Sequence, residues 1–171
     1  MLDLNMLSNF GIDVSCGELT QLGTNGKLSE YHCAVGLAAF DEWEGIKRER
    51  RELHKRYSAA IHEACPEIRL QHKDENGIYP IFPVLLPSGT DTDAVRQRLL
   101  AKGISTRRWY CPPLHSHPAL RGQATIGPME VAEDLGARIL GVPFFLGISD
   151  DEIVWVLQAL AESSLRPQAV D

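Results

Sequence analysis

The order of its periodic segments limits the fold of this chain more than any other feature. Two long helical runs come first, over residues 31–43 and 46–64, and then a strand, a strand, a helix, a strand and two more helices. The expected strands are Ile68–Gln71, Ile81–Leu86 and Ile104–Tyr110. Strands that are segregated from the long helices and joined by short turns favour an α+β fold, in which helices pack against a small, mostly antiparallel three-stranded sheet.

The two helical runs differ in their apolar pattern. Residues 31–40 are apolar nearly all round, which predicts burial on more than one side. Residues 46–64 have one apolar seam, and lysines and arginines crowd the opposite face, which we expect to be solvated. The seam consists of Ile46, Leu53, Tyr57, Ala60, Ile61 and Ala64.

Short signals predict where the later helices begin and end. Thr90 can cap a helix over residues 91–102, which Gly103 would end. A helix over residues 128–140 would begin at a proline, with Gly141 and Pro143 after its end. Its apolar face would consist of Val131, Leu135 and Ile139. Residues 149–152 form a capping box that opens the last helix. The apolar seam of that helix would consist of Ile153, Val156, Leu157 and Leu160.

Composition excludes several classes of protein. At 171 residues the chain is one domain, or one domain with an appendage. A net charge of −6 argues against nucleic acid as the main partner, because phosphate binding favours a basic surface. No apolar run approaches the roughly 20 residues that span a membrane. The first five residues do not resemble a signal peptide. The four cysteines include no Cys-x-x-Cys pair, so we expect reduced thiols in the cytoplasm.

A glycine-containing loop precedes the first helical run. Its sequence is Gly23-Thr24-Asn25-Gly26-Lys27-Leu28-Ser29-Glu30. Such a loop before a helix start presents backbone amide donors, which suit an anion. On its residues alone the loop is better explained as a simple turn. Residues 1–25 show no sustained helix or strand period and are expected to be irregular.

Several blocks of this sequence, in this order, resemble the C-terminal half of the DegT/DnrJ/EryC1/StrS aminotransferases. Residues 105–110 with Leu114 and His115 resemble the subgroup that aminates nucleotide-linked deoxysugars. The resemblance covers most of residues 9–162. The blocks are Gly23–Glu30, the helical run with Leu53 and Tyr57, Tyr79–Leu85, Gly103–Ala119, Pro128–Glu133 and Val142–Phe144.

The resemblance implies a fold, a cofactor and a domain division. It implies the C-terminal small domain of a fold-type I aminotransferase dependent on pyridoxal phosphate (PLP), within a cytoplasmic dimer. In that family the Schiff-base lysine and the aspartate that pairs with the pyridine nitrogen lie upstream, in a large domain. Residues 1–25 are therefore expected to be a remnant of the link to a missing large domain, 26–162 the small domain and 163–171 a tail.

The resemblance also implies residues that contact ligands. Asn25 would reach across a dimer interface to the phosphate of the partner's PLP, and Lys27 would lie near a phosphate of cofactor or substrate. Many family members have an aromatic residue where this chain has Gly26, which puts an aromatic contact there in doubt.

Four further residues fall in the segment with which family members line the sugar-nucleotide site. Arginine suits a diphosphate because its guanidinium binds two oxygens at once, and an aromatic ring can stack on a base or sugar. The structural alternative is a strand with alternating exposure, in which Arg108 pairs with a carboxylate and the aromatic residues lie in the core. The four residues are Arg107, Arg108, Trp109 and His115.

No catalytic or metal-binding residue is predicted within the chain. Cys111, His115 and His117 do not have a spacing typical of zinc ligands. None of the lysines lies in a setting that would lower its pKa for Schiff-base formation. These lysines are Lys27, Lys47, Lys55, Lys73 and Lys102.

Three hypotheses follow. The first is the C-terminal part of a PLP-dependent aminotransferase that moves an amino group, from glutamate, onto a keto-sugar nucleotide; it is inactive alone and acts with a PLP-bearing large-domain polypeptide. The second is a non-catalytic module that binds a sugar nucleotide or regulates a full-length homologue. The apolar run over residues 31–40 motivates both hypotheses. Such a run is expected to be buried, and a chain of this length is not expected to bury it without another polypeptide. The third is a decayed reading frame without a selected function.

Overall fold

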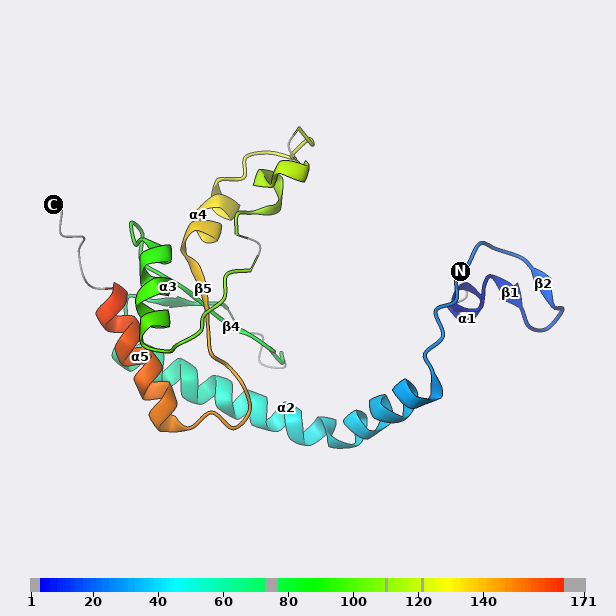
Figure 1. Cartoon of the computed structure of the whole chain (residues 1–171), viewed down its shortest axis with the longest axis horizontal. Coiled ribbons are helices and arrows are strands. Elements are labelled where there is room, and N and C mark those ends of the chain that lie inside the picture. The colour runs from blue at the N-terminus through cyan, green and yellow to red at the C-terminus, as the bar shows by residue number, and fades with distance from the viewer. Residues whose placement is uncertain (1–3, 73–76, 110, 121, 165–171) are drawn as a thin grey trace. The chain divides into compact units, whose positions relative to one another are not determined.

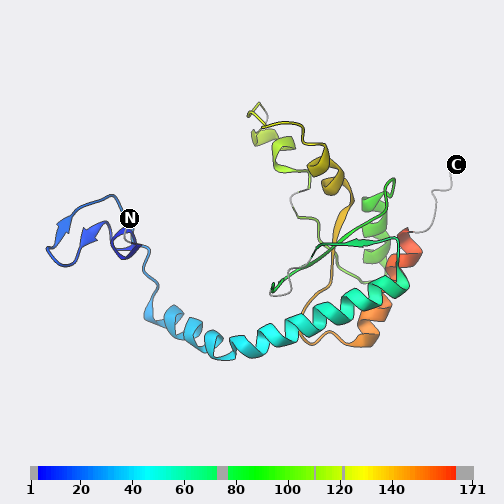
Figure 2. The same ribbon diagram turned by 180° about the vertical axis from the view of Figure 1, so that it is seen from behind.

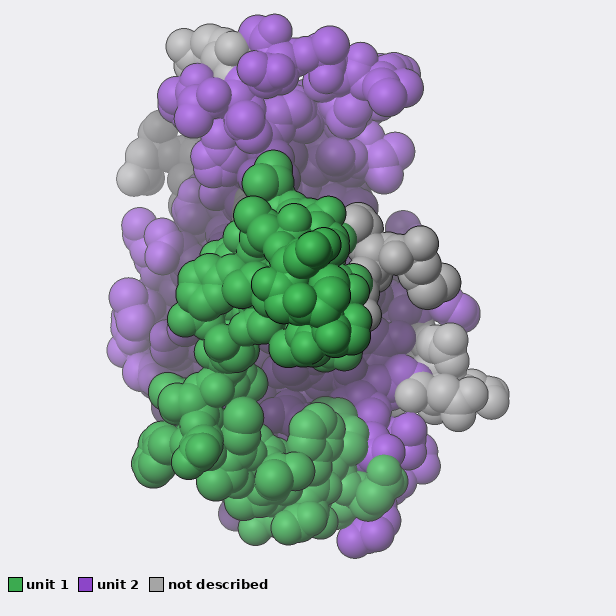
Figure 3. All heavy atoms as spheres, turned by 90° about the vertical axis from the view of Figure 1, so that its right-hand side faces the viewer, with its two compact units in different colours: residues 1–46 green, residues 47–171 purple. Residues whose placement is uncertain are grey.

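A computed structural model describes residues 4–72, 77–109, 111–120 and 122–164 of the chain. The chain divides into two compact units, residues 1–46 and residues 47–171, which Figure 3 shows in different colours. This division follows Ile46, whereas the boundary between link and small domain predicted after residue 25 stays a prediction.

The first unit begins with a short helix and a two-stranded hairpin. Helix α1 spans Leu4–Ser8, and strands β1 (Ile12–Asp13) and β2 (Glu18–Leu19) pair antiparallel, with Ile12 opposite Leu19. The prediction that this segment is irregular is therefore wrong. Its strands are two residues long, which is too short for an alternating pattern to be recognised.

Two glycines let the backbone of this unit approach itself closely. Gly11 has a φ of +85°, and a Cβ atom there would lie 1.8 Å from the carbonyl oxygen of Gln21. A Cβ atom on Gly23 would lie 2.3 Å from the amide nitrogen of Gly11. Backbone contacts, more than side chains, therefore fix the path of residues 11–23.

Helix α2 spans Glu30–Ala64 without a break, and the prediction of two helices is wrong. Gly45 lies between the two predicted runs and is part of the continuous helix. A glycine inside a helix costs about 1 kcal/mol against alanine, which does not end a helix when no proline follows. The predicted start is confirmed, because the Ser29 hydroxyl accepts a hydrogen bond from the His32 amide at 3.3 Å.

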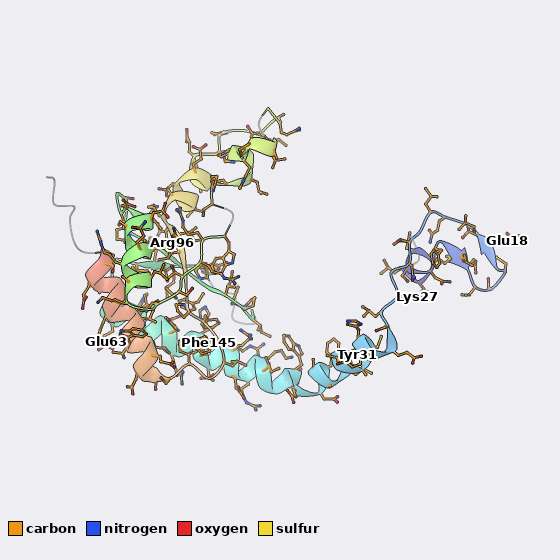
Figure 4. The ribbon with its side chains drawn as sticks, in the orientation of Figure 1. Glu18, Lys27, Tyr31, Glu63, Arg96 and Phe145 are labelled. Atoms are coloured by element: carbon orange, nitrogen blue, oxygen red, sulfur yellow. The ribbon has the colours of Figure 1, made fainter. Side chains whose placement is uncertain are left out.

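The apolar residues at the start of α2 lie exposed in this chain. The side chains of Tyr31 and Phe40 are 76% and 73% exposed, and the labelled Tyr31 projects from the helix in Figure 4. Burial of residues 31–40 was predicted from their apolar content. Within the described residues, the chain provides no cover for this surface.

The second unit contains a three-stranded antiparallel sheet, which confirms the predicted α+β fold class. Its strands are β3 (Arg69–Leu70), β4 (Phe82–Leu85) and β5 (Ile139–Val142), in the order β3-β4-β5. Figure 1 labels β4 and β5. Phe82 pairs with Val142 and Leu85 with Ile139. Alternate residues of β4 are buried, so one face of the sheet packs against helices.

The third strand is β5 rather than the predicted Ile104–Tyr110. In the described part of that segment, Arg107 makes an isolated bridge to Gly141; Tyr110 lies outside the described residues. The run Ile139–Val142 was predicted to contain a helix end because Gly141 and Pro143 follow Leu140. Helix α4 instead ends at Arg138, whose guanidinium donates to the carbonyl oxygen of Leu86 at 2.8 Å.

The core of the second unit lies between the sheet and the helices α2, α3 (Thr92–Ala101) and α5 (Asp150–Ser164). Helices α3 and α5 lie side by side in Figures 1 and 2. The predicted seam of α5 is confirmed, because Ile153, Val156, Leu157 and Leu160 are all buried.

Two caps fix the ends of these helices. Asp91, and not the predicted Thr90, caps α3, because its carboxylate accepts a hydrogen bond from the Ala94 amide at 3.0 Å. The predicted capping box of α5 is confirmed: the Ser149 amide donates to the Glu152 carboxylate at 2.8 Å, and the Glu152 amide donates to the Ser149 hydroxyl at 3.2 Å.

An arm of the second unit joins Trp109 to β5. It contains the short 3-10 helices η1 (Leu114–Ser116) and η2 (Pro118–Leu120), followed by α4 (Glu130–Arg138). The predicted apolar face of α4 is not buried, since Val131 is 74% exposed. Among the helices of the described residues, none combines the length and apolar content that membrane crossing requires.

Candidate functional site

The six residues predicted to contact ligands fall in both units. Asn25 and Lys27 belong to the first, and Arg107, Arg108, Trp109 and His115 to the second. Each set of residues therefore has its contacts within its own unit.

The loop of residues 23–27 runs antiparallel to the chain after α1, through a bridge between Asn9 and Asn25. The Thr24 amide donates to the Leu7 carbonyl oxygen at 2.9 Å, and the Gly26 amide donates to the Ser8 carbonyl oxygen at 2.9 Å. These two backbone donors therefore bond within the unit. Anion binding by this loop stays a prediction.

Lys27 is held by two neighbours in the same unit. Its Nζ atom donates to Oδ1 of Asn9 at 2.9 Å and lies 5.4 Å from the centre of the Phe10 ring (Figure 4). An ammonium group has three N–H donors, so two remain for another acceptor. With the side chains of Asn25 and Lys27 both exposed, an anion at this loop would be bound by side chains.

A groove of about 260 Å³ lies in the second unit where residues 105–109 bridge to β5. Arg107 and Trp109 contribute a cation and an indole ring, and Ile81 and Phe144 contribute apolar side chains. A cation beside aromatic and apolar surface can bind a phosphate and the face of a ring together. The groove is lined by Pro80, Ile81, Ser105, Arg107, Trp109, Gly141, Val142, Pro143 and Phe144.

Arg108 does not line this groove. Its guanidinium lies 3.3 Å from the Asp93 carboxylate and donates to the carbonyl oxygen of Gly136 at 2.5 Å, near the end of α4. Its side chain is 21% exposed. This is the arrangement of the structural alternative, in which Arg108 pairs with a carboxylate, and successive residues of an extended segment point to opposite sides.

Arg108 instead borders a second hollow, of about 430 Å³, together with Cys111, Pro113 and Glu133. His115 lies near this region, because its Nε2 atom is 3.1 Å from the Glu133 carboxylate. The pair joins η1 to α4 within the arm. The structure thus brings Arg107 and Trp109 together and separates them from Arg108 and His115.

Aromatic side chains support the groove from the core. The ring centres of Phe82 and Phe144 are 5.3 Å apart, and those of Tyr57 and Phe82 are 4.8 Å apart. Burial raises the pKa of the Tyr57 hydroxyl far above its ordinary value. Tyr57 is therefore neutral and structural, and Phe144 is fixed by this cluster where it lines the groove.

Seven of the nine groove residues were not predicted as site residues. Pro80 and Ile81 were assigned to the start of a strand at an edge or a bulge, and Gly141 and Phe144 to the region after a helix. The seven are Pro80, Ile81, Ser105, Gly141, Val142, Pro143 and Phe144. The signal that could have found them is the glycine inside the apolar run Ile139–Val142, since a glycine in a strand often indicates a close approach of another group.

The described residues contain no group of side chains arranged to hold a metal ion. Three of the lysines are held in polar contacts: Lys27 by Asn9 at 2.9 Å, Lys55 by Glu52 at 2.8 Å and Lys102 by Glu162 at 2.5 Å. Lys73 lies outside the described residues.

Comparison with known proteins assigns this fold. The model of the DegT/DnrJ/EryC1/StrS aminotransferase family matches residues 3–161. The chain belongs to this family. Its fold matches that of a protein from Bacillus cereus assigned as a PLP-dependent aminotransferase, with a TM-score of 0.82, 23% identity and coverage of 91% of this chain and 42% of that one.

The names of two further relatives refer to nucleotide-linked sugars. A dTDP-4-amino-4,6-dideoxy-D-glucose transaminase from Escherichia coli is 26% identical over 93% of this chain and 44% of its own length. The crystal structure of DesI in the presence of its TDP-sugar product is 30% identical, with a TM-score of 0.79, over 95% of this chain and 42% of that one. The chain thus spans about two fifths of these family members.

Proposed function

We propose that this chain provides the small-domain part of a PLP-dependent aminotransferase that transfers an amino group, from glutamate, to a keto-sugar nucleotide. The family membership and the 30% identity to DesI over 95% of this chain support the reaction class. The groove that combines Arg107 with Trp109 is the observation that carries the substrate class.

Each groove residue has a chemical role in this proposal. Arg107 is exposed beside the groove, and its guanidinium would bind oxygens of the nucleotide's phosphates. Trp109 would stack on the base or a sugar face. His115 and Arg108 were predicted for the same site, and their contacts to Glu133 and Asp93 favour a role in holding the arm next to it.

The residues of the first unit fit one portion of the cofactor. PLP supplies an electron sink that stabilises negative charge at the carbon from which the amino group leaves. Its phosphate needs cationic and amide donors, which Lys27 and Asn25 have on exposed side chains. We propose that they bind this phosphate across the interface of a cytoplasmic dimer, and that the lysine that binds PLP covalently comes from outside these 171 residues.

A second candidate is a non-catalytic module that binds a sugar nucleotide or regulates a full-length homologue. The exposed apolar residues of α2 between Tyr31 and Phe40 favour a protein partner in either case. The two candidates differ in what that partner supplies: the first needs a PLP-bearing large domain, and the second needs a complete enzyme whose activity the chain changes.

Isolation of the tagged full chain from its host tests the choice. A stoichiometric companion that absorbs as bound PLP, and an activity that requires both polypeptides, would support the split enzyme. A companion that is active without this chain would favour the regulatory module. A chain that has no companion and does not bind dTDP-glucose would contradict both proposals. The Lys27→Met variant tests the role at the cofactor phosphate separately, since it should keep the companion but require more PLP for activity.

A further inference from the structure

Gly141 in strand β5 lies under the ring of Trp109. A Cβ atom on Gly141 would lie 2.1 Å from both Cη2 and Cζ3 of that indole, far inside any allowed contact. The backbone of Gly141 does not need a positive φ, so the glycine provides space and not conformational freedom. Glycine weakens a strand, and it occurs there where another group must approach closely.

The same residue also fixes the backbone beside Arg107. The Arg107 amide donates to the Gly141 carbonyl oxygen at 2.9 Å, and the Gly141 amide donates to the Arg107 carbonyl oxygen at 2.6 Å. Arg107 and Trp109 are two residues apart in an extended segment, so their side chains share one side. Gly141 therefore contacts both ends of the segment that forms one wall of the groove.

We propose that Gly141 is a positioning residue for Arg107 and Trp109. Because Gly141 has no side chain, the indole of Trp109 can occupy the space above it and take its position in the groove, which we call the seat of the indole. For its ligand, this inference rests on the proposed function. For the seat itself, it rests on the contact between Gly141 and Trp109. A methyl group at residue 141 would push the indole out of its seat, while the strand and its pairing to β4 could persist.

Tryptophan fluorescence of the full chain gives the first test. The sequence has three tryptophans, so substitution of Trp43 and Trp155 by phenylalanine leaves Trp109 as the only reporter. In this background Gly141→Ala should shift the emission of Trp109. It should also raise the dTDP-glucose concentration needed for half-maximal quenching about tenfold or more. Gly45→Ala is the matched control, because a Cβ atom there meets no atom within 4 Å, and it should change neither signal.

A double-substitution cycle gives the second test and separates positioning from general damage. Overpacking at Gly141 should lower the melting temperature of the chain by about 5 °C. Trp109→Leu removes the indole ring, so in that background Gly141→Ala should lower the melting temperature much less. An equal loss in both backgrounds, or an unchanged Trp109 emission in Gly141→Ala, would overturn the proposal.

Failure of the proposed function gives a different pattern. If dTDP-glucose does not quench Trp109 in the parent protein, the assigned ligand is wrong. The emission shift and the coupling between residues 109 and 141 would still decide whether Gly141 seats the indole.

Discussion

The two parts of helix α2 have opposite environments. Between Lys47 and Ala64 the helix buries Leu53, Tyr57 and Ile61 in the core of the second unit. Between Glu30 and Ile46 it leaves Tyr31 and Phe40 more than 70% exposed. The C-terminal part of α2 therefore packs into a core. Its N-terminal part has apolar side chains that no described residue covers. The difference indicates that the second unit is stabilised by its own core, whereas the start of α2 contributes no buried side chain to a core of the first unit within the described residues.

The largest expected effect is the loss of stability when a buried side chain of α2 is truncated. Ile61→Ala removes a fully buried side chain and should lower the free energy of unfolding by about 2–5 kcal/mol. Leu37→Ala, in the same helix at 67% exposure, should change it by less than about 0.5 kcal/mol. Urea unfolding of both variants measures the contrast, and equal losses would contradict it.

A smaller effect is expected from the backbone contact in the first unit. Gly11→Ala adds a methyl group 1.8 Å from the Gln21 carbonyl oxygen at a φ of +85°. The local cost should be about 1–3 kcal/mol, which opens residues 11–26 without unfolding the second unit. Hydrogen exchange should become faster at the Thr20, Thr24 and Gly26 amides and stay unchanged in the second unit. Unchanged exchange of these amides would disprove the close contact.

Removal of a helix cap comes next. Ser149→Ala deletes the hydroxyl that accepts from the Glu152 amide, and it should lower stability by about 1 kcal/mol. Thr90→Ala is the informative control, because Asp91 and not Thr90 caps α3. Thermal unfolding should show a loss for the first variant and little change for the second, and the reverse result would restore the cap predicted from the sequence.

The smallest effect is a pH dependence at the same cap. The hydrogen bonds from the Ser149 amide and hydroxyl hold the pKa of the Glu152 carboxyl below its ordinary value of 4.5. A carboxyl with a lowered pKa in the folded state stabilises the fold above its unfolded pKa, and this contribution is lost as the pH falls through the folded value. The melting temperatures of the parent and Glu152→Gln should therefore differ at neutral pH and converge in acid. A constant difference would contradict this assignment.

The fold class could be predicted from the sequence because apolar periodicity is local. The seams at Leu53, Tyr57 and Ile61 and along α5 needed only helical spacing, and the capping box at Ser149 needed only residues three apart. The third strand could not be predicted so easily. Ile139–Val142 pairs with β4 through contacts distant in sequence, and an apolar run with a glycine is equally typical of a helix end.

The candidate site also contains residues that could be predicted from the sequence and residues that could not. Arg107 and Trp109 were predicted and do line one groove. Arg108 was predicted with them but faces Asp93 and the end of α4, because neighbouring residues of an extended segment alternate in direction. Gly141, which seats the indole, has no side chain by which a ligand-binding role could have been recognised.

The most direct test of the account is to locate the lysine that binds PLP. The chain, copurified with its companion and loaded with PLP, would be reduced with borohydride, and both polypeptides would then be mapped by mass spectrometry. The account predicts a pyridoxyl group on the companion and none on residues 1–171. A pyridoxyl group on Lys27, Lys47, Lys55, Lys73 or Lys102 would contradict it.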